Sequence, residues 1–150
     1  MNKTALAILA LVALGLAVFL WNVTSQPAPQ DQAVTPSTTA QPTAAPIVEV
    51  ALPTELSSEA QIGKRAFEAK CAQCHGVDAA GNNSAGPPLV HKIYEPNHHG
   101  DAAFLVAVRN GVRQHHWDFG NMMPVEGLTD ADVKYIVQYV RELQQENGIR

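Results

Sequence analysis

The sequence predicts an all-α domain, because three segments have helical periodicity and none alternates apolar and polar residues for long enough to form a strand. Each of the three segments opens with a residue type that caps helices and then repeats apolar residues at helical spacing. The loops between them are rich in Gly, Pro and Asn, which end helices and form turns. The segments are residues 58–70, 101–110 and 129–147.

The first predicted helix begins at Ser58 and runs to about Lys70. Residues 58–61 have the pattern of a capping box, in which two side chains bond the free N–H groups at the start of a helix. Gly63 lies on the apolar face, where it allows another helix to approach closely. The apolar side chains on that face are Ile62, Ala66 and Phe67.

Capping residues also mark the other two helices. Asp101 is the expected N-cap of the second helix, and Asn110 and Gly111 are expected to end it. The third helix opens with another capping-box pattern at residues 129–132 and ends before Gly148. The side chains expected to point inward are Phe104, Leu105 and Val108 from the second helix, and Val133, Ile136, Val137, Tyr139 and Val140 from the third.

Residues 1–25 form a predicted membrane segment. From Ala5 to Trp21 the chain has no charge over roughly 17 residues, a length between that of a secretory h-region and that of a spanning helix. Lys3 before this run and Trp21 at its end favour an uncleaved anchor with the amino terminus inside. The alternative is cleavage after Ser25, and in either case the rest of the chain is exported.

Residues 26–54 are rich in Pro, Ala, Thr, Gln and Ser and have few large apolar side chains. Such a segment buries too little surface to offset its ordering entropy, so we expect a disordered, semi-extended linker. The folded domain is expected at residues 55–150, and from Gln61 onward its charge is nearly balanced. The whole chain of 150 residues has a formal charge of -4 with no long run of one sign, which argues against nucleic acid as a partner.

The sequence Cys71-Ala72-Gln73-Cys74-His75 has the C-x-x-C-H spacing of a haem attachment site. Its two thiols lie one helical turn apart and can add to the two haem vinyl groups, and the adjacent imidazole can bind the iron. Other interpretations of the pair are weaker. A thioredoxin-like redox site needs a βαβ setting, a zinc site needs further cysteines or histidines at ligand spacing, and a plain disulfide leaves His75 unexplained.

From about residue 58 to residue 147, the chain resembles the class I monohaem cytochromes c, of the membrane-anchored bacterial type. In that family a first helix ends in C-x-x-C-H, a Gly-Pro loop follows, and a Met-Pro loop precedes the last helix. The resemblance implies one covalent haem c, with its iron, wrapped by helices. It also implies that Gly63 and Phe67 pack against an aromatic residue of the last helix, which would be Tyr139.

The resemblance further assigns two loops to the haem. In the first loop, the carbonyl group of Pro87 would accept a hydrogen bond from the iron ligand His75. In the second, the sixth ligand would be Met122 or Met123. The usual Met-Pro pair of the family selects Met123, but Met122 is favoured because Trp117 stands five residues before it. In small bacterial members a tryptophan at that spacing often bonds a haem propionate, which makes Trp117 a candidate donor, with loop packing as the alternative.

A haem with histidine and methionine ligands implies electron transfer, because both axial positions of the iron are filled. The resemblance therefore implies a single-electron carrier between respiratory membrane complexes. The donor would be a quinol-oxidising complex or a dehydrogenase, and the acceptor a terminal oxidase or reductase. The expected location is a bacterial inner membrane, with one N-in span and the haem domain in the periplasm. The alternatives are a small haem enzyme, either a peroxidase or an oxidase subunit with a displaceable sixth ligand, and a haem or metal sensor.

Four histidines, the pairs His98-His99 and His115-His116, are not required by the family pattern. One hypothesis makes them a second metal site, for copper for example. The other makes them loop residues near the haem edge or solvent. The second is favoured, because adjacent histidines lack the i, i+4 spacing that presents two imidazoles on one helix face.

Overall fold

The computed structural model describes residues 2, 14–22 and 45–150. The chain divides into two units, Met1–Thr39 and Ala40–Arg150. In the first unit, residues 14–22 are helical and exposed. Over the described parts of the chain, no helix has both the length and the apolar character needed to cross a membrane. The rest of the predicted membrane segment, the alternative cleavage position and the predicted linker as far as residue 44 lie outside the described residues.

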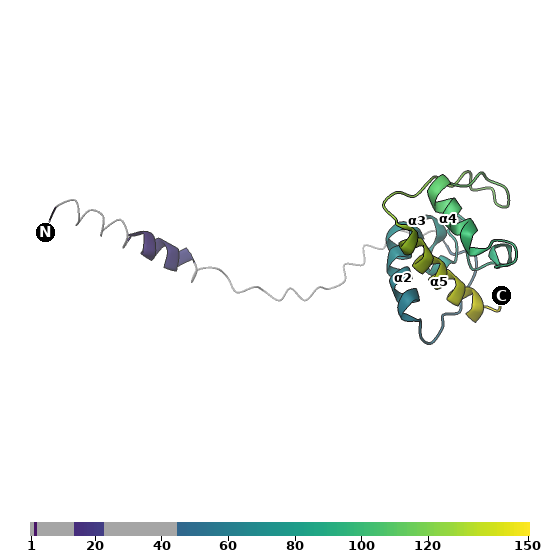
Figure 1. The fold of residues 1–150 in the computed structure, drawn as a ribbon, viewed down its shortest axis with the longest axis horizontal. Helices are drawn as coiled ribbons and strands as arrows, with labels where there is room; N and C mark the ends of the chain where they lie inside the picture. Colours follow the sequence, from purple (N-terminus) through teal and green to yellow (C-terminus); the bar gives the residue numbers. More distant parts are fainter. Residues whose placement is uncertain (1, 3–13, 23–44) are drawn as a thin grey trace. The chain divides into compact units, whose positions relative to one another are not determined.

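The second unit is helical, as the sequence predicts. Within residues 45–150, pairing of β type is limited to two isolated bridges, Asn82 with Gly86 and Val112 with Met122. Helix α5 packs against both α2 and α4 (Figure 1). The helices of this unit are α2 (Ser58–Lys70), α3 (Ala72–His75), α4 (Asp101–Asn110) and α5 (Asp130–Glu146), with two short 3-10 helices, η1 (Val77–Ala79) and η2 (Lys92–Tyr94).

The contact between α2 and α5 forms the centre of the core. The rings of Phe67 and Tyr139, both almost fully buried, lie 5.6 Å apart between centroids, which confirms the expected aromatic contact. Gly63 faces α5 so closely that a Cβ atom there would overlap the carbonyl oxygen of Tyr135. The predicted burial of Ile62 is wrong, because it lies about 200° around the helix from the buried Ala60 and is 39% exposed.

The start of α2 differs from the predicted capping box. The N-cap is Ser57, whose hydroxyl oxygen accepts a hydrogen bond from the backbone N–H of Ala60 at 3.1 Å, whereas the Ser58 hydroxyl donates to Glu59. The Ser57 hydroxyl also donates to the carboxylate of Glu142 in α5 at 2.6 Å. Ser57 is therefore the cap because that position bonds to two helices at once, a contact that the local sequence does not reveal.

Replacing Ser57 with Ala is expected to lower the free energy of unfolding by about 1 kcal/mol, within the range of about 0.5–2 kcal/mol for lost N-caps. The matched variant Ser58→Ala should change it by less than about 0.5 kcal/mol, because its side chain bonds only an exposed neighbour. Denaturant unfolding of the two variants measures the difference. If Ser58→Ala proves the more damaging of the two, then Ser58 is the N-cap and α2 begins at Glu59.

Helix α4 begins with Gly100 as its N-cap, so the prediction that Asp101 caps it is wrong. Asp101 is the first helical residue, and its carboxylate instead accepts a hydrogen bond from Nε of Arg141 at 2.8 Å. The carboxylate is thus engaged with α5 rather than with the N–H groups of its own helix. The end of α4 at Asn110, followed by Gly111, is confirmed.

Helix α5 begins as the sequence predicts, with a complete capping box. The Thr129 side chain accepts from the backbone of Asp132, and the Asp132 carboxylate accepts from the backbone of Thr129 at 2.8 Å.

The side chains expected to point inward from α4 and α5 contact the core. In α4, Val108 is buried while Phe104 and Leu105 are half-buried against the core. The five α5 residues expected to point inward are all buried, namely Val133, Ile136, Val137, Tyr139 and Val140.

The sequence predicted that the folded domain starts at residue 55. In the structure, residues before 55 already contact the domain. The backbone N–H groups of Ile47 and Val48 both donate to the carbonyl group of Ala80, at 3.0 and 3.1 Å. The backbone of Ala51 bonds the side-chain amide of Asn147 in both directions. A composition rich in Pro and Ala does not reveal these contacts, because they are made by backbone groups to distant parts of the chain.

Candidate haem-binding site

The C-x-x-C-H segment lies at the junction of α2 and α3. Cys71 ends α2, and its carbonyl oxygen accepts hydrogen bonds from the backbone N–H groups of Cys74 and His75, at 3.1 and 2.9 Å. Both cysteines are free thiols. Burial, and then the nearby Cys74, raises the pKa of the Cys71 thiol to about 11. Redox-active thiol pairs have a lowered pKa, so this environment argues against a thioredoxin-like site.

A tight loop after His75 fixes the orientation of this turn. Gly76 has a φ of 75°, and a Cβ atom there would overlap the carbonyl oxygen of Gly81. The backbone N–H of Gly81 in turn donates to the carbonyl group of His75 at 2.7 Å. Asp78 has a left-handed φ of 52°, and its carboxylate accepts from the hydroxyl of Tyr139 at 2.8 Å. Tyr139, a core residue of α5, therefore holds the loop in place.

His75 makes the hydrogen bond that the family resemblance implies. Its Nδ1 lies 2.9 Å from the carbonyl oxygen of Pro87. A carbonyl oxygen only accepts, so Nδ1 carries the proton and Nε2 keeps a lone pair that can bind a metal. Burial lowers the pKa of the His75 imidazole, although the Pro87 carbonyl opposes this. The neutral ring, which is the state that a metal ligand needs, is therefore favoured at neutral pH.

The loop that carries Pro87 is held against the cysteine turn. Gly86 pairs with Asn82 in an isolated bridge, and a Cβ atom on Gly86 would lie 2.8 Å from the carbonyl oxygen of Cys74. Only a residue without a side chain fits this approach without a shift of the backbone. The Gly-Pro sequence thus brings the Pro87 carbonyl within reach of His75 and the cysteines.

The two methionines of the Met-Pro loop differ in exposure. Met122 is half-buried and its backbone pairs with Val112 through two hydrogen bonds of 2.9 and 3.0 Å. Met123 is 74% exposed. The pairing holds the backbone of residue 122 against the segment that follows α4, and Met122 is the less exposed of the two methionines. Its role as iron ligand stays a prediction.

Trp117 has a buried indole N–H without a hydrogen-bond acceptor. Burial raises the pKa of the nearby Tyr94 phenol and the indole lowers it, yet their geometry is not that of a hydrogen bond. A buried donor left without an acceptor costs about 1–3 kcal/mol, so an anionic group placed there would be stabilised. A haem propionate is such a group, and the residues present therefore fit a c-type haem.

The site combines two free thiols, an imidazole with an available nitrogen, a half-buried methionine and an unpaired indole donor. In a helical fold, these groups fit a haem-binding domain. The family model Cytochrome c matches residues 60–144, more than half of the chain. The chain therefore belongs to the cytochrome c family, which implies a c-type haem with iron and haem-based electron transfer. Comparisons with curated proteins and with solved structures gave no match.

A buried polar pair that the sequence did not predict positions the loop before α4. Arg141 and Gln144 of α5 are almost fully buried and both donate to the carbonyl group of Tyr94, at 2.7 and 3.0 Å. The sequence contains a signal for this pair. Arg141 is four residues after Val137 and Gln144 is three residues after Arg141, so both lie on the apolar helix face of Val137. Polar residues on an apolar face indicate a buried hydrogen-bond network.

Proposed function

We propose that this protein carries single electrons through a covalently attached, His/Met-ligated c-type haem. The observation that supports the proposal best is the hydrogen bond from His75 Nδ1 to Pro87, which leaves Nε2 available beside two free thiols. When bound, the haem supplies a reversible one-electron couple at its iron. Cys71 and Cys74 would hold it by thioether bonds, and His75 and Met122 would be the protein ligands of its iron.

The alternative of a small haem enzyme requires Met122 to leave the iron so that a substrate can bind. Two hydrogen bonds to Val112 hold the backbone of Met122 in place, so such a displacement requires rotation of its side chain or a break of this pairing. A sensor role would likewise require Met122 to be replaced as the iron ligand when the signal binds. The state of the sixth position therefore separates the carrier from both alternatives.

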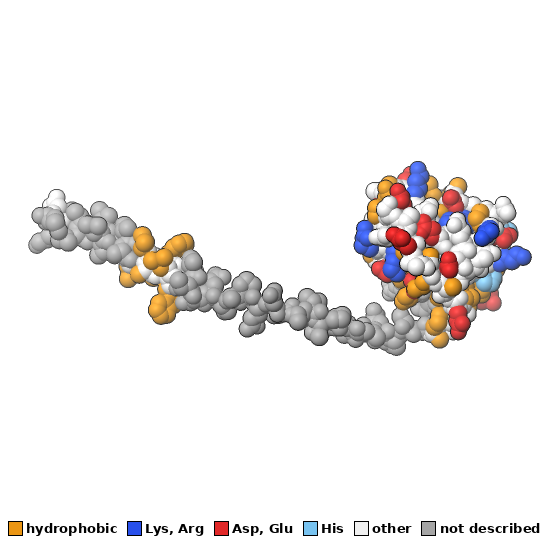
Figure 2. Space-filling view, turned by 90° about the horizontal axis from the view of Figure 1, so that it is seen from below, with side chains coloured by type: hydrophobic (Ala, Val, Ile, Leu, Met, Phe, Trp, Pro, Cys, Tyr) orange, Lys and Arg blue, Asp and Glu red, His pale blue; other side chains and the backbone are white. Residues whose placement is uncertain are grey.

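We further propose that the domain works on the periplasmic face of a bacterial inner membrane, tethered by a single N-in segment within residues 1–25. The apolar side chains of residues 14–22 support this, since they are exposed in the first unit. The proposed partners are a quinol-oxidising complex or dehydrogenase as donor and a terminal oxidase or reductase as acceptor. Figure 2 shows acidic and basic side chains interspersed on one face of the domain, which favours short-range docking over long-range electrostatic steering.

The absorption spectrum of the oxidised, haem-loaded protein tests the carrier proposal. We expect the weak far-red band of a bond between methionine sulfur and ferric iron. Met122→Ala should abolish the band, whereas the matched variant Met123→Ala should keep it, because residue 123 is mostly exposed. Absence of the band from the unmodified protein would put the enzyme and the sensor first. Its loss only in Met123→Ala would reverse the choice of ligand.

A further inference from the structure

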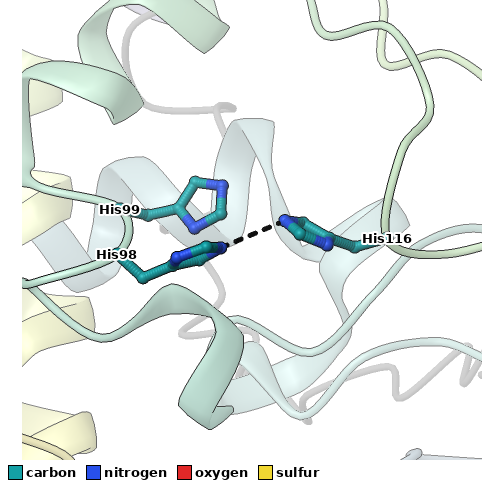
Figure 3. Close-up of side chains that lie close together, drawn as sticks. All are labelled: His98, His99 and His116. Carbon is teal, nitrogen blue, oxygen red and sulfur yellow. Dashed lines mark hydrogen bonds between the residues drawn. The ribbon is translucent and has the colours of Figure 1, made fainter.

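Three histidines outside the haem site come together from two separate loops. His98 and His99 precede α4, and His116 follows it, 18 residues after His98. One ring nitrogen of each lies within 4.8 Å of those of the other two. Figure 3 shows the three rings turned toward one another across the gap between the loops. The fold thus brings together three of the four histidines of the two pairs, for which the sequence spacing had favoured a role as separate loop residues over a metal site.

The distances within this cluster suit a metal ion. Nε2 of His98 and Nε2 of His116 are 3.4 Å apart. Two nitrogens bound to one tetrahedral ion, at metal–nitrogen distances of about 2.0–2.1 Å, lie about 3.3 Å apart. The third nitrogen, within 4.8 Å, reaches the same position with a shift on the order of 1 Å.

The tautomer of His99 also suits a metal ion. Nδ1 of His99 lies 2.7 Å from the carbonyl oxygen of Ile93 and therefore carries the proton, which leaves a lone pair on Nε2. Neutral imidazoles are the form that binds metal ions.

Both loops are held in place by the rest of the domain. Arg141, only 7% exposed, donates from Nη2 to the carbonyl group of His99 at 2.6 Å. In the other loop, the backbone N–H of Gln114 donates to Asn121 at 3.0 Å, and that of Gly120 donates to the Gln114 side chain at 2.8 Å. The cluster is therefore largely preorganised, so that binding an ion orders few additional groups.

We propose that His98, His99 and His116 bind one divalent transition-metal ion of the Zn²⁺ or Cu²⁺ class, separate from the haem iron. Imidazole donors select such ions over Mg²⁺ and Ca²⁺, which require oxygen ligands. Three histidines leave a fourth position open to water. His98 and His116 are exposed, so an ion enters directly from solvent. The bound ion joins the loop before α4 to the loop that carries Trp117 and Met122.

Calorimetric titration of the full-length, haem-loaded protein with Zn²⁺ tests this site. Zn²⁺ is the probe because it has no redox chemistry of its own. We expect one equivalent to bind, and we expect His98→Gln and His116→Gln each to weaken binding by at least about 100-fold, since each removes a direct ligand. The control is His115→Gln, which changes an adjacent histidine outside the group of three and should keep the affinity.

The haem spectrum of each variant verifies that the domain is folded. As a second readout, excess Zn²⁺ should raise the unfolding temperature of the unmodified protein but not that of His116→Gln. The proposal fails if the unmodified protein binds no Zn²⁺ in the titration. It also fails if His115→Gln loses as much affinity as His116→Gln, because binding would then depend on exposed histidines in general.

Discussion

Replacing both Cys71 and Cys74 with Ala will abolish covalent haem attachment, so that haem no longer stays with the denatured chain. The two thiols are free and lie on one helical turn, where the carbonyl group of Cys71 accepts from the backbone of both Cys74 and His75. This turn fixes the spacing between the sulfurs and the His75 imidazole. Haem staining of a denaturing gel measures the effect, since haem held only by axial ligands is released on unfolding.

The matched control changes a residue between the two cysteines. Gln73 is exposed and contributes its backbone carbonyl group to Asn82, so Gln73→Ala should leave the haem stain unchanged. The single variants Cys71→Ala and Cys74→Ala should each keep one attachment. Haem that remains on the denatured double variant would contradict attachment at these two positions.

Replacing Gly63 with Ala will lower the free energy of unfolding by at least about 3 kcal/mol, at or beyond the upper end of ordinary overpacking. The added Cβ would overlap the carbonyl oxygen of Tyr135 and lie 2.9 Å from the backbone nitrogen of Ile136. These are backbone atoms of α5, so no side chain can rotate away and the helices must separate. The separation would also loosen the contact between Phe67 and Tyr139.

Helix propensity alone predicts the opposite sign, because Ala is favoured over Gly by about 1 kcal/mol inside a helix. The two effects are therefore separable by denaturant unfolding of the haem-loaded protein. Arg65→Ala, at an exposed position of the same helix, is the control and should change stability by less than about 0.5 kcal/mol. A stabilising effect of Gly63→Ala would mean that α2 and α5 do not pack at this glycine.

Features governed by spacing along the chain were predictable from the sequence. The capping box at Thr129 forms as expected, because both partners lie within one helical turn. The C-x-x-C-H turn is also local, and it lies within residues 60–144, which match the cytochrome c family. The contact between Phe67 and Tyr139 joins distant residues, and it was predictable only because the family resemblance supplied the pairing.

Features that depend on distant contacts were decided by the tertiary structure. Ser57 rather than Ser58 caps α2 because Glu142 of another helix bonds it, and Asp101 fails to cap α4 because Arg141 engages its carboxylate. The sequence by itself determined the helical class and the capping box of α5, since both follow from periodicity and short spacings. Only packing decided which methionine is sheltered, where the domain begins, and that two unrelated histidine loops meet, because such contacts form only when the whole core assembles.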